Sequence, residues 1–239
     1  PDAARQHFDF VLESLRDLYR ALRKIGGQLQ LVTGEVTEVL ARLHRQAPFG
    51  DLYSHEETGN GLTFQRDLAV ARWCRANAVI WHESPQFGVV RRLQARDHWQ
   101  RLWDEFMAQG QVVAPEIVRC VSLPWNEAPP PSAEMLGLRE PEVPSRQLGG
   151  RQAGLQILRD FLVDRSNQYR GGISSPLSAP TACSRLSPYL ALGCLSLREV
   201  VQTTRLFAAQ LPASASQQRA GLQAFISRLY WHCHFIQKL

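Results

Sequence analysis

Hydrophobic positions in the first 110 residues alternate between helical spacing and short continuous runs. Apolar side chains recur every three or four residues over 8–25, 36–43 and 99–107, and a further helical stretch covers 65–77. Short apolar or strand-like runs at 29–32, 51–54 and 78–81 lie between these stretches. Strands that alternate with helices of about 10 to 15 residues indicate βαβ units. Residues 1–110 are therefore predicted to form an α/β domain with a doubly wound, Rossmann-like parallel sheet.

The remaining positions divide into a connector and a second domain. Residues 111–148 hold seven of the fourteen prolines and show no continuous helical or strand pattern, which predicts an interdomain connector. After Gly149 and Gly150 the apolar positions return to helical spacing and keep it up to Leu239. Residues 149–239 are therefore predicted to be the start of an all-α domain.

Both ends of the chain interrupt this pattern. No strand precedes the first predicted helix, residue 1 is proline, and residue 239 falls inside an apolar helical stretch. We therefore expect the sequence to be the middle of a longer protein.

Composition excludes several classes of protein. With 44% hydrophobic and 21% charged residues, the chain is neither disordered nor fibrous. No run approaches the roughly 18 apolar residues of a membrane span, and the first residues lack the hydrophobic core of a signal peptide. The five cysteines are scattered and form no CxxC pair, so neither a disulfide framework nor a zinc site is predicted. A reducing, cytoplasmic location is expected.

The formal charge of +5 is concentrated in the last part of the chain. Residues 1–110 carry 14 Lys and Arg against 14 Asp and Glu, and residues 111–148 carry 3 against 5. Residues 149–239 carry 10 against 3, a net charge of +7. A cationic surface of this kind attracts nucleic acid or a nucleotide cofactor, although an arginine-rich solvated surface would have the same composition.

Three short motifs carry little weight. The glycines of residues 59–61 lack the remaining features of a dinucleotide fingerprint. Residues 55–57 and Glu83 follow predicted strands and could supply acid–base groups, but polar loop residues are the simpler interpretation. Residues 232–234 read His-Cys-His, but neighbours one and two apart on a helix point in different directions and cannot converge on one metal ion.

A longer segment carries more chemistry. Tyr169 and Arg170 precede a loop rich in Gly, Ser and Pro, and residues 181–200 then read TACSRLSPYLALGCLSLREV. Ser187 and Pro188 are typical of a helix start, where unsatisfied N–H groups and the positive end of the helix dipole favour an anion. From these residues alone, a capped helix without a ligand remains an alternative.

The stretch Ser184-x-Leu186-Ser187-Pro188-Tyr189-Leu190, with Gly193-Cys194-Leu195-Ser196, resembles the FAD-holding signature of the photolyase/cryptochrome flavoprotein family. The order of the whole chain agrees from about residue 8 to Leu239: an α/β domain, a connector, and then the helices around the signature. The resemblance implies an N-terminal antenna domain and an all-α FAD-binding domain. The residues that it assigns to FAD are Tyr169, Cys183, Ser184, Arg185, Leu186, Ser187 and Phe225.

The resemblance also implies a DNA-facing set. Trp231 matches the aromatic that stacks against a flipped-out pyrimidine dimer in repair enzymes of the family, and Arg170, Arg228 and His232 join it. Arg170, Arg185 and Arg228 would belong to the positive surface that meets the DNA backbone.

Several positions depart from the family pattern. Arg228 stands where the family usually carries Glu or Gln, and Trp231-His232-Cys233 stands where it carries Trp-Arg-Glu. Phe225 occupies a frequent tryptophan position, and Cys183 replaces a small hydroxyl residue or proline. These departures indicate a modified substrate pocket.

The function implied by the resemblance is FAD-dependent, blue-light-driven repair of pyrimidine dimers in DNA by electron transfer from reduced flavin. This is a carbon–carbon lyase of deoxyribodipyrimidine photolyase type, expected to act on damaged DNA as a monomer. The alternatives are a cryptochrome-like FAD photoreceptor that signals through a partner protein, and an unrelated α/β module that binds a partner.

Two expectations concern pigments. A second, antenna chromophore of folate or deazaflavin type would agree with the family, but no residue is assigned to it. No metal is expected. Since the family's later helices complete the flavin pocket, the 239-residue chain alone is expected to bind FAD weakly or not at all.

Overall fold

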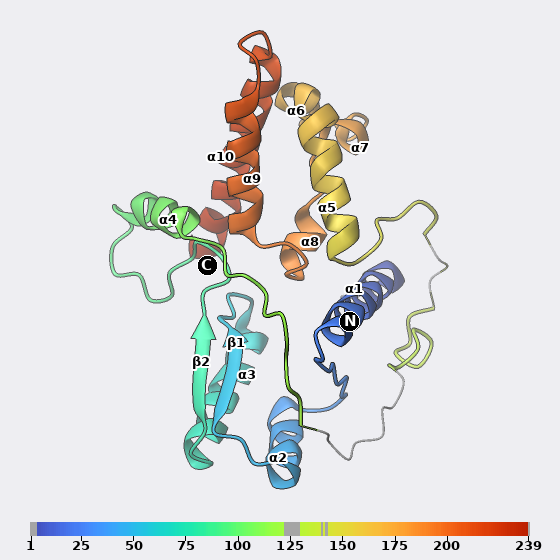
Figure 1. Ribbon diagram of the computed structural model, residues 1–239, viewed down its shortest axis with the longest axis vertical. Coiled ribbons are helices and arrows are strands. Elements are labelled where there is room, and N and C mark those ends of the chain that lie inside the picture. Colours follow the sequence, from blue (N-terminus) through green and yellow to red (C-terminus); the bar gives the residue numbers. More distant parts are fainter. Residues whose placement is uncertain (1–3, 122–129, 140, 142, 239) are drawn as a thin grey trace.

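Helices make up most of the computed structural model of the chain, which describes residues 4–121, 130–139, 141 and 143–238 (Figure 1). Two short strands flank the third helix, one before it and one after it in the chain. In chain order the elements are α1 (Arg5–Lys24), α2 (Val36–Gln46), β1 (Asp51–His55), α3 (Gly61–Ala76), β2 (Ile80–Ser84), α4 (Trp99–Ala108), α5 (Arg151–Asp160), the π-helical turn η1 (Phe161–Arg165), α6 (Ser166–Gly172), α7 (Ala179–Ala182), α8 (Ser187–Ala191), α9 (Leu197–Gln210) and α10 (Ser216–Lys238).

The two strands form a parallel pair, and α3 is the crossover between them. Asp51 pairs with Ile80 and His55 with Ser84, so the carboxyl ends of the strands meet at one edge. The side chain of Asn60 accepts hydrogen bonds from the N–H groups of Leu62 and Thr63 and thereby caps the start of α3. The predicted α/β fold class is confirmed, and the described sheet contains these two strands; residues 29–32 lie in no strand.

A small apolar core joins the sheet to its neighbouring helices. Its buried members are Leu40 from α2, Val70 and Cys74 from α3, and Val79 just before β2. The strands themselves are mostly exposed, and Tyr53 and Ile80 are 73% and 61% exposed.

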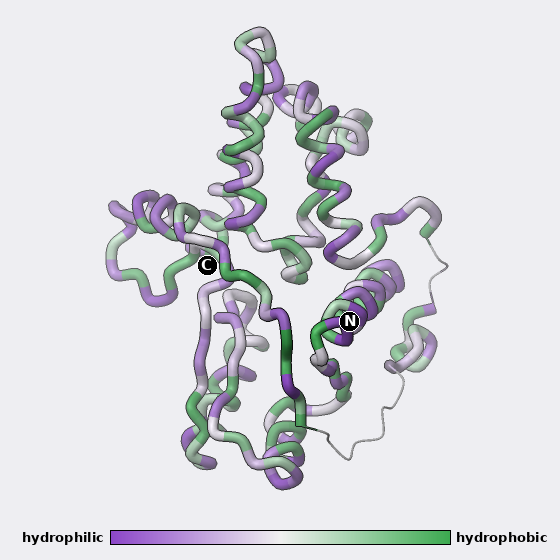
Figure 2. The backbone as a smooth tube through the Cα atoms, in the orientation of Figure 1, coloured by the Kyte–Doolittle hydropathy of each residue, from purple (hydrophilic) through white to green (hydrophobic). Residues whose placement is uncertain are grey.

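A much larger core lies among the later helices, which gather at one end of the molecule in Figure 1. Polar and apolar residues alternate along these helices in Figure 2, as expected for amphipathic helices that bury one face. Trp103 and Met107 of α4 and Phe10 of α1 pack into the same core. The division of the chain at residues 110 and 148 remains a prediction.

Helices α6 and α10 cross at very short distance. A Cβ atom on Gly221 would lie 1.9 Å from the carbonyl oxygen of Ser166, so only glycine permits this approach. Next to the crossing, the buried amide of Gln218 donates to the carbonyl oxygens of Leu162 (2.8 Å) and Val163 (3.1 Å) and contacts the Ser166 hydroxyl. These bonds satisfy carbonyl groups of the π-helical turn, where the regular helical ladder is interrupted.

Helix α5 begins against α1. Glu13, Ser14 and Asp17 of α1 accept hydrogen bonds from the N–H groups of Gly149, Gly150 and Arg151 at the start of α5. The Arg146 guanidinium, paired with Glu13 at 2.6 Å, lowers the pKa of that carboxyl group. This junction fixes the end of the predicted connector and, through it, the neighbourhood of the signature loop.

Candidate cofactor and nucleic-acid site

Three aromatic side chains meet where η1, α6 and α10 pack together. The ring centroids of Phe161 and Phe225 are 4.6 Å apart, and the Tyr169 ring lies 5.3 Å from Phe161 and 5.7 Å from Phe225, all edge to face. All three residues are buried. Two of the predicted FAD residues, Tyr169 and Phe225, are thus brought together although they lie 56 positions apart in the chain.

The environment of the Tyr169 phenol is apolar. Burial raises its pKa to about 12; Cys183 acts in the same direction and Arg228 opposes it. Cys183 and Arg228 therefore lie near enough to the phenol to act on its charge. No described residue lies within hydrogen-bond distance of the Tyr169 hydroxyl, which therefore remains available to a ligand.

The predicted signature loop lies between α7 and α8. Cys183 follows the last residue of α7, Leu186 is buried, and Ser187 is the exposed first residue of α8. Arg185 adopts φ +57°, a left-handed conformation that is rare for residues with a side chain. Among the described residues, the backbone N–H groups of Ser184, Arg185 and Leu186 donate to no acceptor.

Two side chains hold the loop by its carbonyl groups. Arg165 of η1 donates to the carbonyl oxygens of Cys183 and Ile157, both at 2.8 Å, and Gln147 donates to that of Arg185 at 2.8 Å. Burial lowers the pKa of Arg165, and the neighbouring charge of Arg185 adds to this effect. The carbonyl oxygens of Cys183 and Arg185 thus accept hydrogen bonds from the protein, while the N–H groups of residues 184–186 meet no acceptor in the described part of the chain.

This arrangement fits FAD, the cofactor implied by the resemblance. Free N–H groups and the unpaired phenol suit diphosphate oxygens, and the aromatic cluster provides an apolar wall. Ser184 and Ser187 would add hydroxyl groups to the same loop as further hydrogen-bond donors to the cofactor.

The predicted DNA-facing residues divide into two groups. On α10, Trp231 is 45% exposed and the Arg228 guanidinium lies 4.4 Å from the centroid of its ring, in a cation–π arrangement. Arg170 is also exposed, at a kink within α6. His232 instead lies against Phe87, with ring centroids 5.1 Å apart, and burial lowers its pKa. The structure therefore brings Arg228 and Trp231 together but places His232 among apolar neighbours.

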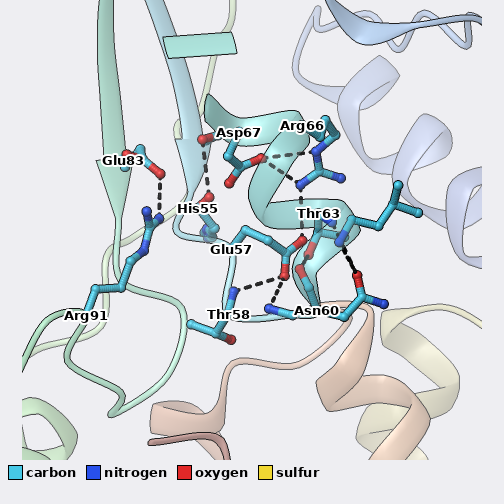
Figure 3. A network of polar contacts seen from close by, with 12 residues as sticks. His55, Glu57, Thr58, Asn60, Thr63, Arg66, Asp67, Glu83 and Arg91 are labelled. Carbon is cyan, nitrogen blue, oxygen red and sulfur yellow. Dashed lines mark hydrogen bonds and ion pairs between the residues drawn. The ribbon is translucent and has the colours of Figure 1, made fainter. Parts of the chain in front are cut away.

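The polar residues at the carboxyl edge of the sheet pair with one another (Figure 3). Glu83 and Glu56 both face Arg91. Glu57 accepts hydrogen bonds from the N–H groups of Thr58 and Gly59 and pairs with Arg66. These contacts support the interpretation of this edge as a network of polar loop residues.

Comparison with known proteins decides the family. Residues 1–96 match the family described as DNA photolyase. A deoxyribodipyrimidine photo-lyase from Halobacterium salinarum is 33% identical over 253 aligned positions, which cover 99% of this chain and 51% of that protein. The chain belongs to the photolyase and cryptochrome family.

Solved structures of photolyases and cryptochromes share the fold. A cryptochrome from Synechocystis superimposes with a TM-score of 0.79 at 18% identity, covering 98% of this chain and 50% of that one. A photolyase from Sulfolobus tokodaii, described with two FAD molecules, gives 0.63 at 22% identity, covering 98% and 48%. The chain thus spans about half the length of these photolyases and cryptochromes.

Two features of this photolyase-like chain escaped the sequence analysis. No role was predicted for Arg165 or Gln218, yet both turn inward to bind carbonyl groups of distant segments. The signal available for Arg165 was its place four residues before Tyr169, but its partner Cys183 is 18 positions away. In the described part of the chain, no group of His, Cys, Asp and Glu could hold a metal ion. Likewise, none of its helices is long and apolar enough to cross a membrane.

Proposed function

We propose that the protein containing this chain binds FAD through the segment from α6 to α8 and through α10. The observation that carries the proposal is the contact between Tyr169 and Phe225, with Cys183 near enough to act on the charge of the phenol, beside a loop whose N–H groups meet no acceptor among the described residues. Arg185 and Leu186 would contribute main-chain N–H groups, and Ser184 and Ser187 main-chain or hydroxyl groups. The Sulfolobus photolyase, which is described with FAD, supports the choice of cofactor by its shared fold.

We further propose that the complete protein repairs pyrimidine dimers in DNA under blue light. When bound in its reduced form, FAD supplies the light-driven electron that opens the cyclobutane ring and is then returned. The residues of this chain bind and orient: Trp231 offers a ring for stacking against a flipped base, while Arg170 and Arg228 bind phosphates. The similarity to the Halobacterium photo-lyase supports this activity.

The experiment measures blue-light repair of an oligonucleotide with one pyrimidine dimer by the complete natural protein. Trp231→Ala should lower the affinity for this oligonucleotide by about 10-fold or more, since stacking of a base on an aromatic side chain contributes roughly 1 to 3 kcal/mol. Phe64→Ala is the matched control, because Phe64 is 57% exposed but lies on α3. Unchanged affinity and repair in Trp231→Ala would remove Trp231 from the substrate site.

A cryptochrome-type photoreceptor is the second candidate. The Arg228 guanidinium covers the Trp231 ring at 4.4 Å, on a face that a flipped base would otherwise use. A protein that binds FAD but prefers neither damaged nor undamaged DNA, at several salt concentrations, would favour this role. Salt-resistant preference for the damaged strand would favour repair, since nonspecific phosphate contacts weaken with salt.

A further inference from the structure

Arg228 and Trp231 are neighbours on one face of α10, three residues apart in the chain. Side chains three apart meet on a helix surface, and helical side chains lean toward the N-terminus, so Trp231 leans back toward Arg228. The guanidinium lies over the indole, 4.4 Å from the ring centroid. Both residues are exposed, so a ligand from solvent can reach this pair.

Arg228 has no counter-charge in the described part of the chain. It forms no ion pair or hydrogen bond with another described residue, and α10 contains no Asp or Glu. Arg228 acts on the charge of the Tyr169 phenol, but burial raises the pKa of Tyr169 to about 12, so this phenol is neutral at neutral pH. The N–H donors of the guanidinium are therefore available to a ligand.

The hydrogen-bonding chemistry of arginine distinguishes between pyrimidines. Its side chain has donors and no acceptor, and two of its N–H groups form a fork that matches two adjacent acceptors. Cytosine offers such a pair, O2 and N3, whereas the N3 atom of thymine carries a proton. Both edges persist in a cyclobutane dimer, because its new bonds join C5 and C6 atoms. Against thymine, one donor of the fork would meet the N3–H and find no acceptor.

On the basis of the repair function proposed above, we propose that Arg228 is a specificity-determining residue that selects cytosine over thymine in the dimer. A base that stacks on Trp231 takes the place of the guanidinium, since an exposed cation–π contact is weaker than base stacking. The flexible stem of Arg228, anchored beside the ring, keeps its donors at the edge of the stacked base. Two donors bind O2 and N3 of cytosine, and the others remain for a backbone phosphate.

The test measures binding to two oligonucleotides by the complete natural protein, in the dark so that no repair occurs. One oligonucleotide holds a freshly prepared dimer of two cytosines and the other a dimer of two thymines. The wild type should bind the cytosine dimer about 10-fold more tightly, as expected for a bidentate arginine contact to a base. Arg228→Gln should lose this preference, because its amide has both a donor and an acceptor and can pair with either edge.

Two controls separate this effect from general DNA affinity. Arg170 is also exposed and is proposed to bind phosphate, so Arg170→Gln should weaken binding of both dimers alike and leave their ratio unchanged. Storage of the cytosine dimer in water deaminates it to uracil, which carries a proton on N3. The stored oligonucleotide should therefore bind to the wild type no more tightly than the thymine dimer.

The outcomes distinguish this inference from the repair function on which it rests. A wild type that prefers both dimers to undamaged DNA but binds them equally would overturn the role of Arg228 alone. A preference for cytosine that survives Arg228→Gln would do the same. A wild type that binds neither dimer more tightly than undamaged DNA would overturn the repair function and this inference together.

Discussion

The two cores of the molecule differ in how completely they are enclosed. Among the described residues, the helical core contains many side chains without exposed surface, such as Leu222, Phe161 and Val200. The core beside the sheet has four buried members, and the strands next to it leave Tyr53 and Ile80 largely exposed. Burial of apolar surface stabilises roughly in proportion to its area, so the helical part should dominate the stability of this chain.

The polar groups of the helical part and those beside the sheet also differ in how far they are buried. In the helical part, Gln218 and Arg165 turn inward and bind carbonyl oxygens of distant segments. At the carboxyl edge of the sheet, Arg66 and Arg91 form ion pairs that remain partly exposed. Exposed pairs contribute at most about 1 kcal/mol, whereas an unpaired buried group costs more. The helical part therefore tolerates less change, and it also contains the site proposed for FAD.

The same substitution in both cores tests this contrast most directly. Leu222→Ala should lower the free energy of unfolding by about 2 to 5 kcal/mol, because Leu222 is fully buried and its truncation removes apolar contacts and leaves a cavity. Leu40→Ala, in the small core where Leu40 keeps 9% of its surface exposed, should cost about 2 kcal/mol or less. Urea unfolding followed by circular dichroism measures both. Equal losses would mean that the two cores are equally well packed.

A second pair of variants tests the close crossing of α6 and α10. Gly221→Ala should cost about 3 kcal/mol, since the new methyl group would meet the Ser166 carbonyl oxygen and force the helices apart. Gly61→Ala, at the start of α3, has open space around the new group and should be neutral or slightly stabilising. A mild effect at Gly221 would show that the crossing can relax.

Much of the fold could be predicted from the sequence because its signals are local. The helical spacing over 8–25 and 36–43 corresponds to α1 and α2, and the runs at 51–54 and 78–81 correspond to β1 and β2 within a few residues. The apolar run at 29–32 looked the same but lies in no strand. A strand exists only through hydrogen bonds to a neighbouring strand, which a single segment of sequence does not reveal.

The candidate site shows the same limit. Resemblance to a family identified Tyr169 and Phe225, and the structure brings their rings together. Neither Arg165 nor Gln218 could have been found this way, because their partners are carbonyl groups that become neighbours only after folding. The place of His232 against Phe87 likewise depends on the rotation of α10, which the spacing of its apolar residues leaves undetermined.

The alkaline pH dependence of stability gives the smallest effect and the most local test. The pKa of Tyr169 is raised from 10 to about 12 by burial, so the folded state keeps this proton more firmly than the unfolded state. The contribution of Tyr169 to the free energy of unfolding is therefore fully present below pH 10, and it is lost as the pH rises toward 12. At pH 11 the loss due to Tyr169 should be about 1.4 kcal/mol, equivalent to one pKa unit.

Tyr169→Phe isolates this loss, because other tyrosines are present in both proteins and cancel in the difference. The free energy of unfolding should fall less steeply from pH 9 to pH 11 in this variant than in the wild type. Tyr53→Phe is the control: Tyr53 is 73% exposed, so its removal should leave the wild-type slope unchanged. Identical slopes for wild type and Tyr169→Phe would mean that water reaches the phenol. The aromatic cluster would then be an open surface, and the enclosed helical core would end before the site proposed for FAD.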